Sequence, residues 1–305
     1  MNKVALASSE NRKELFSATA KKMNTTSAII EKDFWVVWVL DKIFSDERLN
    51  KILMFKGGTS LSKVFDLIGR FSEDIDLILD WREVTKEDPK EARDSKTKQV
   101  KFNVQINEDA KAYIKDVLLP VITEIVSPLC TCTIDESDAF NINVTYPASF
   151  DDLYLRPQIL LEIGPLASWL PYDSFEITPY AAQHFSKVFE KPKCSVNAIV
   201  AKRTFWEKAT ILHQEANRVQ DKLLKTVVEF KKKFYPAAWA KFDDAKPGSL
   251  KLLPPSFRIE ELRKDYKAME HMIFDKYLEF DVIIDTLRIL EEMIADELVN
   301  GEKQC

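Results

Sequence analysis

The 305-residue sequence is poor in the residue types that form disulfide-linked folds and zinc sites. It has four cysteines, three histidines and six glycines. Four cysteines do not form a disulfide framework at this length, and the histidines are far apart, which argues against a zinc site. Cys130 and Cys132, in LCTCTI, are expected to share one face of a strand.

Long apolar runs are also absent. The most apolar stretch, FWVVWVL at 34–40, is much shorter than the roughly 18 to 20 residues of a membrane helix and has charged residues on both sides. The first residues lack the continuous apolar segment of a secretory signal. With 46% hydrophobic and 30% charged residues, the composition is globular. We therefore expect a cytoplasmic protein that does not enter a membrane.

Charge is unevenly distributed along the chain, whose net charge is −5. Residues 187–241 contain 13 Lys and Arg against 5 Asp and Glu, whereas residues 259–305 contain 6 against 13. A strongly basic segment in an acidic protein is consistent with local binding of a polyanion, and equally with a solvated helix face.

The spacing of apolar residues alternates between helix and strand periods up to about residue 200 and is almost purely helical beyond it. We expect an α+β core domain at 1–200, with a mixed sheet flanked by helices, and a C-terminal helical bundle at 201–305. The charged stretch 81–101 is expected to be a loop. The stretch 165–200, which is rich in proline and aromatic residues, is expected to cross the surface between the two parts of the chain. The expected helices are 10–22, 28–44, 107–126, 203–216, 220–235, 259–275 and 277–298, and the expected strands are 51–55, 74–79, 129–134, 141–146 and 158–164.

A glycine pair, Gly57 and Gly58, directly follows the first expected strand. Glycine pairs mark places where the backbone turns sharply or approaches another group closely. Thr59 or Ser60 is expected to cap a helix that ends at Gly69. The free N–H groups at its start and the two hydroxyls are suited to bind a phosphate, although P-loop spacing is absent. The core face of this helix is expected to be Leu61, Val64, Phe65 and Ile68.

Three acidic residues lie in stretches that otherwise predict buried strands. Alternation along DIDLIL places the carboxylates of Asp74 and Asp76 on one strand face, where like charges raise the pKa of one carboxyl unless a cation intervenes. A divalent cation such as Mg²⁺ prefers such oxygen ligands. Glu162 lies in the apolar run ILLEIG, where an unpaired charge is costly. If the two strands are neighbours, the three acids form a site for two-metal phosphoryl chemistry. The alternatives are a surface Asp-x-Asp pair and a Glu162 paired with a buried Lys or Arg.

The order strand, Gly-Gly turn, helix, Asp-x-Asp strand and later acidic strand resembles nucleotidyltransferases of the DNA polymerase beta type. Four stretches resemble the AbiEii/AbiGii family of abortive-infection nucleotidyltransferase toxins: EKDFWVVWVL, FKGGTSLSKVF, RFSEDIDLIL and RTFWEKATILHQEA. The resemblance implies a nucleotidyltransferase-like fold and an enzyme that uses Mg²⁺ or Mn²⁺. This enzyme would transfer a nucleoside monophosphate from an NTP to RNA, at the tRNA 3′ end. It also implies a cognate winged-helix antitoxin.

The resemblance further implies roles for single residues. Asp74 and Asp76 would bind the metal together with Glu162, and Lys208 would contact the triphosphate. Without the family, Lys208 is equally well explained as a surface lysine paired with Glu207 or Glu215. The catalytic set is Asp74, Asp76, Glu162 and Lys208, and the nucleotide-binding set is Gly57, Gly58, Thr59, Ser60, Lys63, Ser72 and Lys208.

One segment departs from the family pattern. Relatives follow the LHQEA helix with a segment resembling Arg-His-Tyr-Tyr-Asp-Leu, whose aspartate belongs to the active site, whereas here LHQEANR continues into VQDKLLKTVVEF after Arg218. Asp221 is a candidate stand-in, without matching surroundings. A nucleotidyltransferase fold that binds nucleotide or RNA without turnover is therefore the second interpretation. A different phosphoryl or glycosyl transferase that uses Asp-x-Asp is the third.

Overall fold

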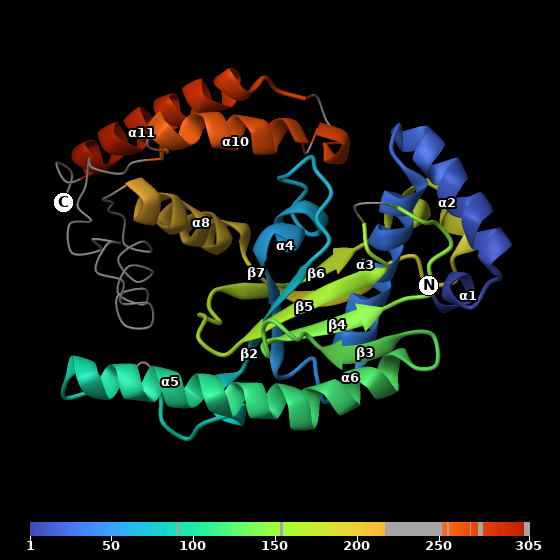
Figure 1. The fold of residues 1–305 in the computed structure, drawn as a ribbon, viewed down its shortest axis with the longest axis horizontal. Helices are drawn as coiled ribbons and strands as arrows, with labels where there is room; N and C mark the ends of the chain where they lie inside the picture. Colours follow the sequence, from blue (N-terminus) through green and yellow to red (C-terminus); the bar gives the residue numbers. More distant parts are fainter. Residues whose placement is uncertain are drawn as a thin grey trace. The chain divides into compact units, whose positions relative to one another are not determined.

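The computed structural model describes residues 1–216 and 252–301, apart from 90, 92, 153–154, 255, 269 and 274–276. It divides into two compact units, Met1–Val200 and Ala201–Cys305. The first unit contains the sheet, and the described part of the second is helical (Figure 1). None of the described helices combines the length and apolar character of a membrane span.

A mixed seven-stranded sheet forms the centre of the first unit, in the order β3-β4-β5-β2-β1-β7-β6. Strand β2 is parallel to β5 and antiparallel to β1, and β1 is parallel to β7. The outer pairs are antiparallel. The predicted mixed sheet with helices is therefore confirmed. The strands are β1 (Leu53–Lys56), β2 (Ile75–Leu79), β3 (Thr131–Ile134), β4 (Asn141–Thr145), β5 (Gln158–Gly164), β6 (Tyr172–Ile177) and β7 (Cys194–Ile199).

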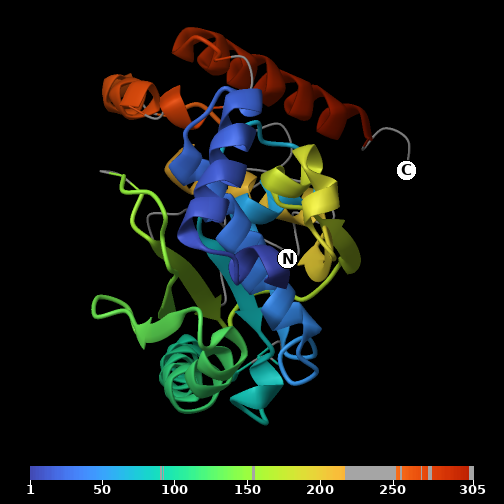
Figure 2. The same cartoon turned by 90° about the vertical axis from the view of Figure 1, so that its right-hand side faces the viewer.

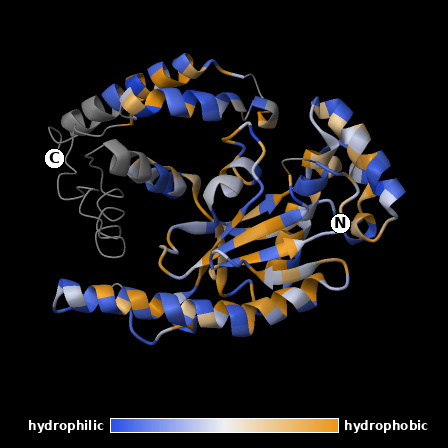
Figure 3. Cartoon of the chain, in the orientation of Figure 1, coloured by the Kyte–Doolittle hydropathy of each residue, from blue (hydrophilic) through white to orange (hydrophobic). Residues whose placement is uncertain are grey.

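Helix α3 (Ser27–Ser45) packs against one face of this sheet, along β5 and β7. Thr26 caps it, because its hydroxyl accepts the N–H of Ile29 at 3.3 Å. Trp35 and Trp38 of α3 are buried in the same core as the inward residues of the central strands, which stand out as apolar in Figure 3. The other helices of this unit are α1 (Asn2–Ala5), α2 (Ser9–Met23), α4 (Gly57–Lys63), α5 (Lys96–Tyr113), α6 (Leu119–Val126) and α7 (Tyr180–His184), with α2, α3 and α7 grouped together in Figure 2.

The opposite face of the sheet carries both apolar and charged side chains. A small cluster of Met54, Ile78 and Ile199 lies on it, with Trp169 packed against them. Side chains alternate along a strand, so the residues two positions from Met54 and Ile78 share this face. This face therefore carries the acids of β2 and β5.

The helix after the glycine pair is shorter than predicted. Helix α4 ends at Lys63, and Asp66 takes a positive φ of 51°, well before Gly69. Thr59 and Ser60 lie inside the helix and do not cap it. The predicted core face is only partly right. Val64 packs against the main core, but the buried side chains are Thr59, Ser60 and Ser62, whereas Leu61, Val64, Phe65 and Ile68 are half-buried.

Part of the expected loop 81–101 is helical. Helix α5 begins at Lys96 because the Ser95 hydroxyl accepts the N–H of Lys98 at 3.2 Å. A π-helical turn, Ile114–Leu118, joins it to α6. The serine cap thus extends the predicted helix 107–126 toward the N-terminus.

The stretch 165–200 is also more regular than predicted. It contains β6, α7 and β7, and β7 lies inside the sheet between β1 and β6. Val196 and Ala198 of β7 are buried in the main core. The proline and aromatic content of the stretch concealed β6 and β7, which pair with each other, and β7 also pairs with β1, which is distant in sequence.

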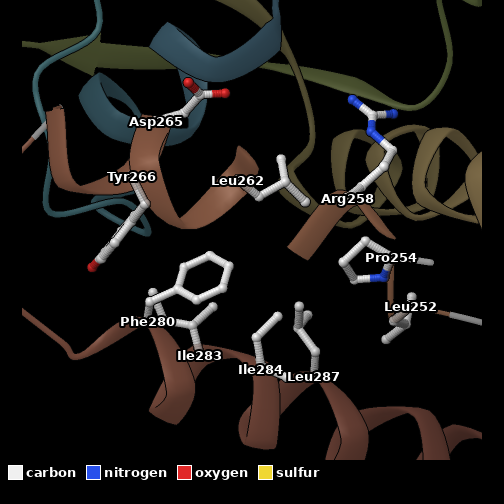
Figure 4. Close-up of a pocket in the computed structure, with 10 residues that line it drawn as sticks. All are labelled: Leu252, Pro254, Arg258, Leu262, Asp265, Tyr266, Phe280, Ile283, Ile284 and Leu287. Carbon is white, nitrogen blue, oxygen red and sulfur yellow. The ribbon is translucent and has the colours of Figure 1, made fainter. Parts of the chain in front are cut away.

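The described helices of the second unit are α8 (Ala201–Ala216), α10 (Ser256–Ala268) and α11 (Phe280–Gly301). Arg263 of α10 pairs with Asp281 of α11 at 2.8 Å. A cavity of about 510 Å³ lies between these helices, with the side chains of Leu262, Phe280 and Ile284 among those that line it (Figure 4). Helices are thus present at three of the four predicted positions, and 220–235 lies outside the described residues.

Candidate active site

Side chains at one level of four neighbouring strands meet on the sheet face opposite α3, which we call the open face because Lys56, Asp76 and Glu162 are partly exposed on it. Lys56 on β1 is directly opposite Asp76 on β2, and Asp76 is opposite Glu162 on β5. Asn141 on β4 is opposite Glu162 on its other side. Opposed residues of adjacent strands point to the same face. The structure therefore places the aspartate strand and the glutamate strand side by side.

Gly57 is required by the position of Asp76. Its φ is +82°, in the left-handed region, and a Cβ at this position would lie 1.7 Å from Oδ2 of Asp76. Gly58 has no such constraint, because its Cβ would meet Oγ of Ser72 at an ordinary 3.6 Å. Gly57 is thus needed because the backbone at this position lies close to the Asp76 carboxylate.

The loop before β2 is tied to helix α4 by hydroxyl groups. The Thr59 hydroxyl donates to the backbone oxygen of Asp74, and it lies 2.8 Å from Oγ of Ser72. The Ser60 hydroxyl donates to the Gly57 carbonyl at 2.9 Å. Thr59 and Ser60 are both buried. Their hydroxyl groups hold the turn and the aspartate loop in place. Their contact with phosphate remains a prediction.

Two of the three acids have raised pKa values. Burial is the main reason that the pKa of Asp74 lies above its usual range, and the nearby Glu73 and Asp76 raise it further. Burial also raises the pKa of Glu162, followed by the charges of Asp76 and Asp74, while Lys56 lowers it. The crowding of negative charge expected for Asp-x-Asp therefore extends to the neighbouring strand.

Three consecutive charged residues of α3 support the surrounding loops. Glu31, Lys32 and Asp33 are all buried. Glu31 accepts the backbone N–H groups of residues 149–150 at 2.8 and 3.1 Å, and Lys32 forms an ion pair with Glu73. Because Glu73 directly precedes Asp74, this pair connects the core helix to the aspartate loop.

Lys63 has an internal partner. Its Nζ lies 2.6 Å from Oδ1 of Asp33, with 4% and 2% of the two side chains exposed, and 3.7 Å from the ring centre of Tyr180. The backbone N–H of Tyr180 donates to the other oxygen of Asp33 at 2.7 Å. Burial raises the pKa of Asp33, and Lys63 opposes the rise. Lys63 therefore helps to hold α4 against α3 and α7, and its predicted contact with the nucleotide remains a prediction.

The acids fit a cation that keeps water and substrate ligands. Among the described residues, no three or more His, Cys, Asp or Glu side chains have the spacing of a complete metal centre. Asp76 and Glu162 share a sheet face and Asp74 directly precedes β2, so the three predicted ligands interact electrostatically without forming such a triad. Mg²⁺ is commonly held by one or two carboxylates, with the remaining positions filled by water and phosphate. Asp74 and Asp76 are suited to that arrangement.

Lys208 lies on the exposed side of α8, in the second unit. Glu207, one of its alternative partners, is instead bound to Arg203 at 3.0 Å. The side chain of Glu215 and the whole of Asp221 lie outside the described residues. The role of Lys208 at the triphosphate therefore remains a prediction.

The sequence reasoning missed Lys32, Lys56 and Glu73. A signal for Lys32 was present, since EKD stands at the start of an apolar helix and buried charges require partners. For Lys56 the deciding fact is the pairing of β1 with β2, and for Glu73 it is the ion pair with Lys32 on α3. No local pattern reveals either.

A mixed sheet that carries acids beside a glycine turn has the features of the nucleotidyltransferase class. The model of the family described as nucleotidyl transferase AbiEii toxin, type IV TA system, matches residues 38–286. This is more than half of the chain, which therefore belongs to the AbiEii family of nucleotidyltransferase toxins of type IV toxin–antitoxin systems. The family implies an antitoxin partner.

Among solved structures, the chain is similar to MenT4, a nucleotidyltransferase toxin from Mycobacterium tuberculosis H37Rv. The identity is 14% and the TM-score 0.44, over 93% of this chain and 98% of that one. A search of curated proteins gives no match.

Proposed function

We propose that this toxin transfers a nucleoside monophosphate from an NTP to a hydroxyl of an RNA acceptor, the tRNA 3′ end being the favoured one. The observation that carries the proposal is the register of β2 and β5, which sets Asp76 beside Glu162, next to the turn at Gly57. In the reaction the acceptor oxygen bonds to the α-phosphorus, and the bond from that phosphorus to the β-phosphate bridge breaks. Pyrophosphate leaves.

The surroundings of the acids support a proposed role for each of them. Asp74 and Asp76 would hold Mg²⁺ or Mn²⁺, which when bound supplies positive charge at the phosphate oxygens. Glu162 would accept the proton of the acceptor hydroxyl, and its raised pKa brings this base closer to neutral pH. The backbone at Gly58 would meet the phosphates. Lys208 would neutralise charge on the leaving pyrophosphate.

The RNA acceptor is proposed from the positive charge of one segment, and the antitoxin partner from the family. The basic segment 187–241 supports a nucleic-acid acceptor, because Lys and Arg bind phosphates irrespective of sequence. Its residues 217–241 lie outside the described residues. The antitoxin partner is proposed to be a winged-helix protein, and the protein is proposed to act in the cytoplasm.

A label-transfer assay tests the proposal. Purified protein is incubated with Mg²⁺, total tRNA and each α-labelled NTP in turn, and labelled RNA is expected with one or more of them. Asp76→Ala is expected to abolish the labelling. The same assay identifies the nucleotide.

A second candidate function is capture of nucleotide or RNA without turnover. The missing family segment after Arg218 favours it. Measurable nucleotide binding without labelled RNA for any NTP would support this second function and overturn the first.

A further inference from the structure

Lys56 is the positively charged member of the row of side chains that crosses the open sheet face. It is directly opposite Asp76, whose other neighbour is Glu162. Its Nζ lies 3.6 Å from Oδ1 of Asp76, and its charge lowers the pKa of Glu162. One ammonium group thus lies beside the two acids that face each other on β2 and β5.

The Lys56 pair is loose, unlike that of Lys63. The distance of 3.6 Å exceeds a hydrogen bond, and 28% of the Lys56 side chain and 23% of the Asp76 side chain are exposed. A lysine ammonium is a compact charge on a flexible stem, so it can change partners without a change in the backbone. The geometry therefore permits Lys56 to leave Asp76.

Lys56 also stands next to the turn that is proposed to receive phosphate. It is the last residue of β1 and directly precedes Gly57, whose backbone approaches Asp76. A side chain that starts there lies beside the carboxylates of β2 and β5, and would also be near the phosphates of a nucleotide bound as proposed.

We propose that Lys56 is an exchangeable counter-ion: it neutralises Asp76 and Glu162 when the site is empty, and moves to the nucleotide phosphates when a divalent cation takes its place. This inference rests on the proposed function. Because the ammonium competes for the same carboxylate, it weakens cation binding in the absence of nucleotide. Because it then binds phosphate, it strengthens nucleotide binding. Removal of its charge must therefore change the two affinities in opposite directions.

A Mn²⁺ titration followed by electron paramagnetic resonance tests the first half on the full chain without nucleotide. The parent, Lys56→Met, Lys56→Arg and Asp76→Asn are compared. Lys51→Met is the matched control, because Lys51 is an exposed lysine that precedes the same strand. For a partly exposed pair, Lys56→Met is expected to tighten Mn²⁺ binding about threefold to fivefold. Lys56→Arg and Lys51→Met are expected to stay near the parent, and Asp76→Asn is expected to lose the site.

Nucleotide affinity tests the second half. The Kd in Mg²⁺ is measured for whichever of ATP, CTP, GTP and UTP the parent binds best. Lys56→Met is expected to weaken it about tenfold, the loss of one charge-assisted phosphate contact, while Lys51→Met leaves it unchanged. Thermal unfolding confirms that each variant is folded.

The outcomes separate this inference from the function on which it rests. If the parent transfers label and binds Mn²⁺ through Asp76, but Lys56→Met leaves Mn²⁺ affinity unchanged or weaker, only the counter-ion inference is overturned. Unchanged nucleotide affinity in Lys56→Met overturns it as well. If the parent has no Mn²⁺ site that depends on Asp76, the proposed metal site and the counter-ion inference are both overturned.

Discussion

Two lysine–aspartate pairs flank helix α4, and they lie in opposite environments. Lys63 and Asp33 are 2.6 Å apart in the core, whereas Lys56 and Asp76 are 3.6 Å apart on the open face. The buried pair has a further partner in the backbone N–H of Tyr180. Removing one member of such a pair leaves an unpaired buried charge, while an open pair contributes little to stability. The same chemical pair is thus structural in one place and available for chemistry in the other.

The largest expected effect is the loss of label transfer when Asp76 of the partly exposed pair is changed. Asp76→Asn is expected to reduce label transfer to RNA by about 10³-fold, because it removes a proposed cation ligand. The free energy of unfolding is expected to stay the same or rise, since the mutual repulsion of Asp76 and Glu162 is relieved. The measurements are initial rates and chemical denaturation of parent and variant. A large loss of stability with this variant would show that the open pair is structural after all.

The buried pair is expected to behave in the reverse way. Lys63→Met is expected to lower the free energy of unfolding by about 3 kcal/mol, because Asp33 is left buried without its cation. Lys56→Met is the matched control and should cost less than about 1 kcal/mol. Urea denaturation measures both. The double variant Asp33→Asn with Lys63→Met should cost less than the sum of the single changes, since the pair is lost only once.

The two glycines of the pair are also expected to differ in the effect of their replacement. Gly57→Ala places a methyl group against Asp76 and requires an unfavourable positive φ, so label transfer is expected to fall about 100-fold. Gly58→Ala is the control for sterics, and its free energy of unfolding should be unchanged or rise by up to about 1 kcal/mol. A Gly57→Ala enzyme with full activity would contradict the close approach at this turn.

The smallest expected effect concerns the buried thiols. Burial raises the pKa of both Cys130 and Cys194 from 9.0 to about 12, so both stay neutral in the native state while they ionise near pH 9 in the unfolded chain. The unfolded state then binds fewer protons, and stability falls as pH rises from about 9 toward 12. Between pH 9 and 10 each thiol is expected to contribute about 1 kcal/mol of this loss. Denaturation of Cys194→Ala at both pH values measures its share, and a loss equal to that of the parent would contradict it.

The secondary structure of the core was largely predictable. The capped apolar pattern of α3, the strand at β5 and the run at β2 follow from residues next to one another in the chain. The buried face of helix α4 was only partly predicted, because Thr59 and Ser60 are buried and donate hydrogen bonds to the aspartate loop and the turn. Such bonds depend on the tertiary structure and not on helix periodicity.

The candidate site was only partly predictable. The spacing of Asp74 and Asp76 marked both acids, since alternation along a strand is a local property. The ion pair of Lys63 was not predicted, because its partner Asp33 is 30 residues away on another helix. The position of Lys56 beside the acids could not be predicted at all, since it depends on the register of β1 and β2.

The sequence alone therefore determined which residues alternate in strands, where charge is out of place in an apolar run, and to which family the chain is similar. The tertiary structure decided that β2 lies between β1 and β5, and that α3 carries the partners of Lys63 and Glu73. The reason is physical: periodicity and capping act over a few residues, whereas the partner of a charge is chosen by the burial of the whole core. That choice separates a lysine that is buried in the core from one that is partly exposed on the sheet face.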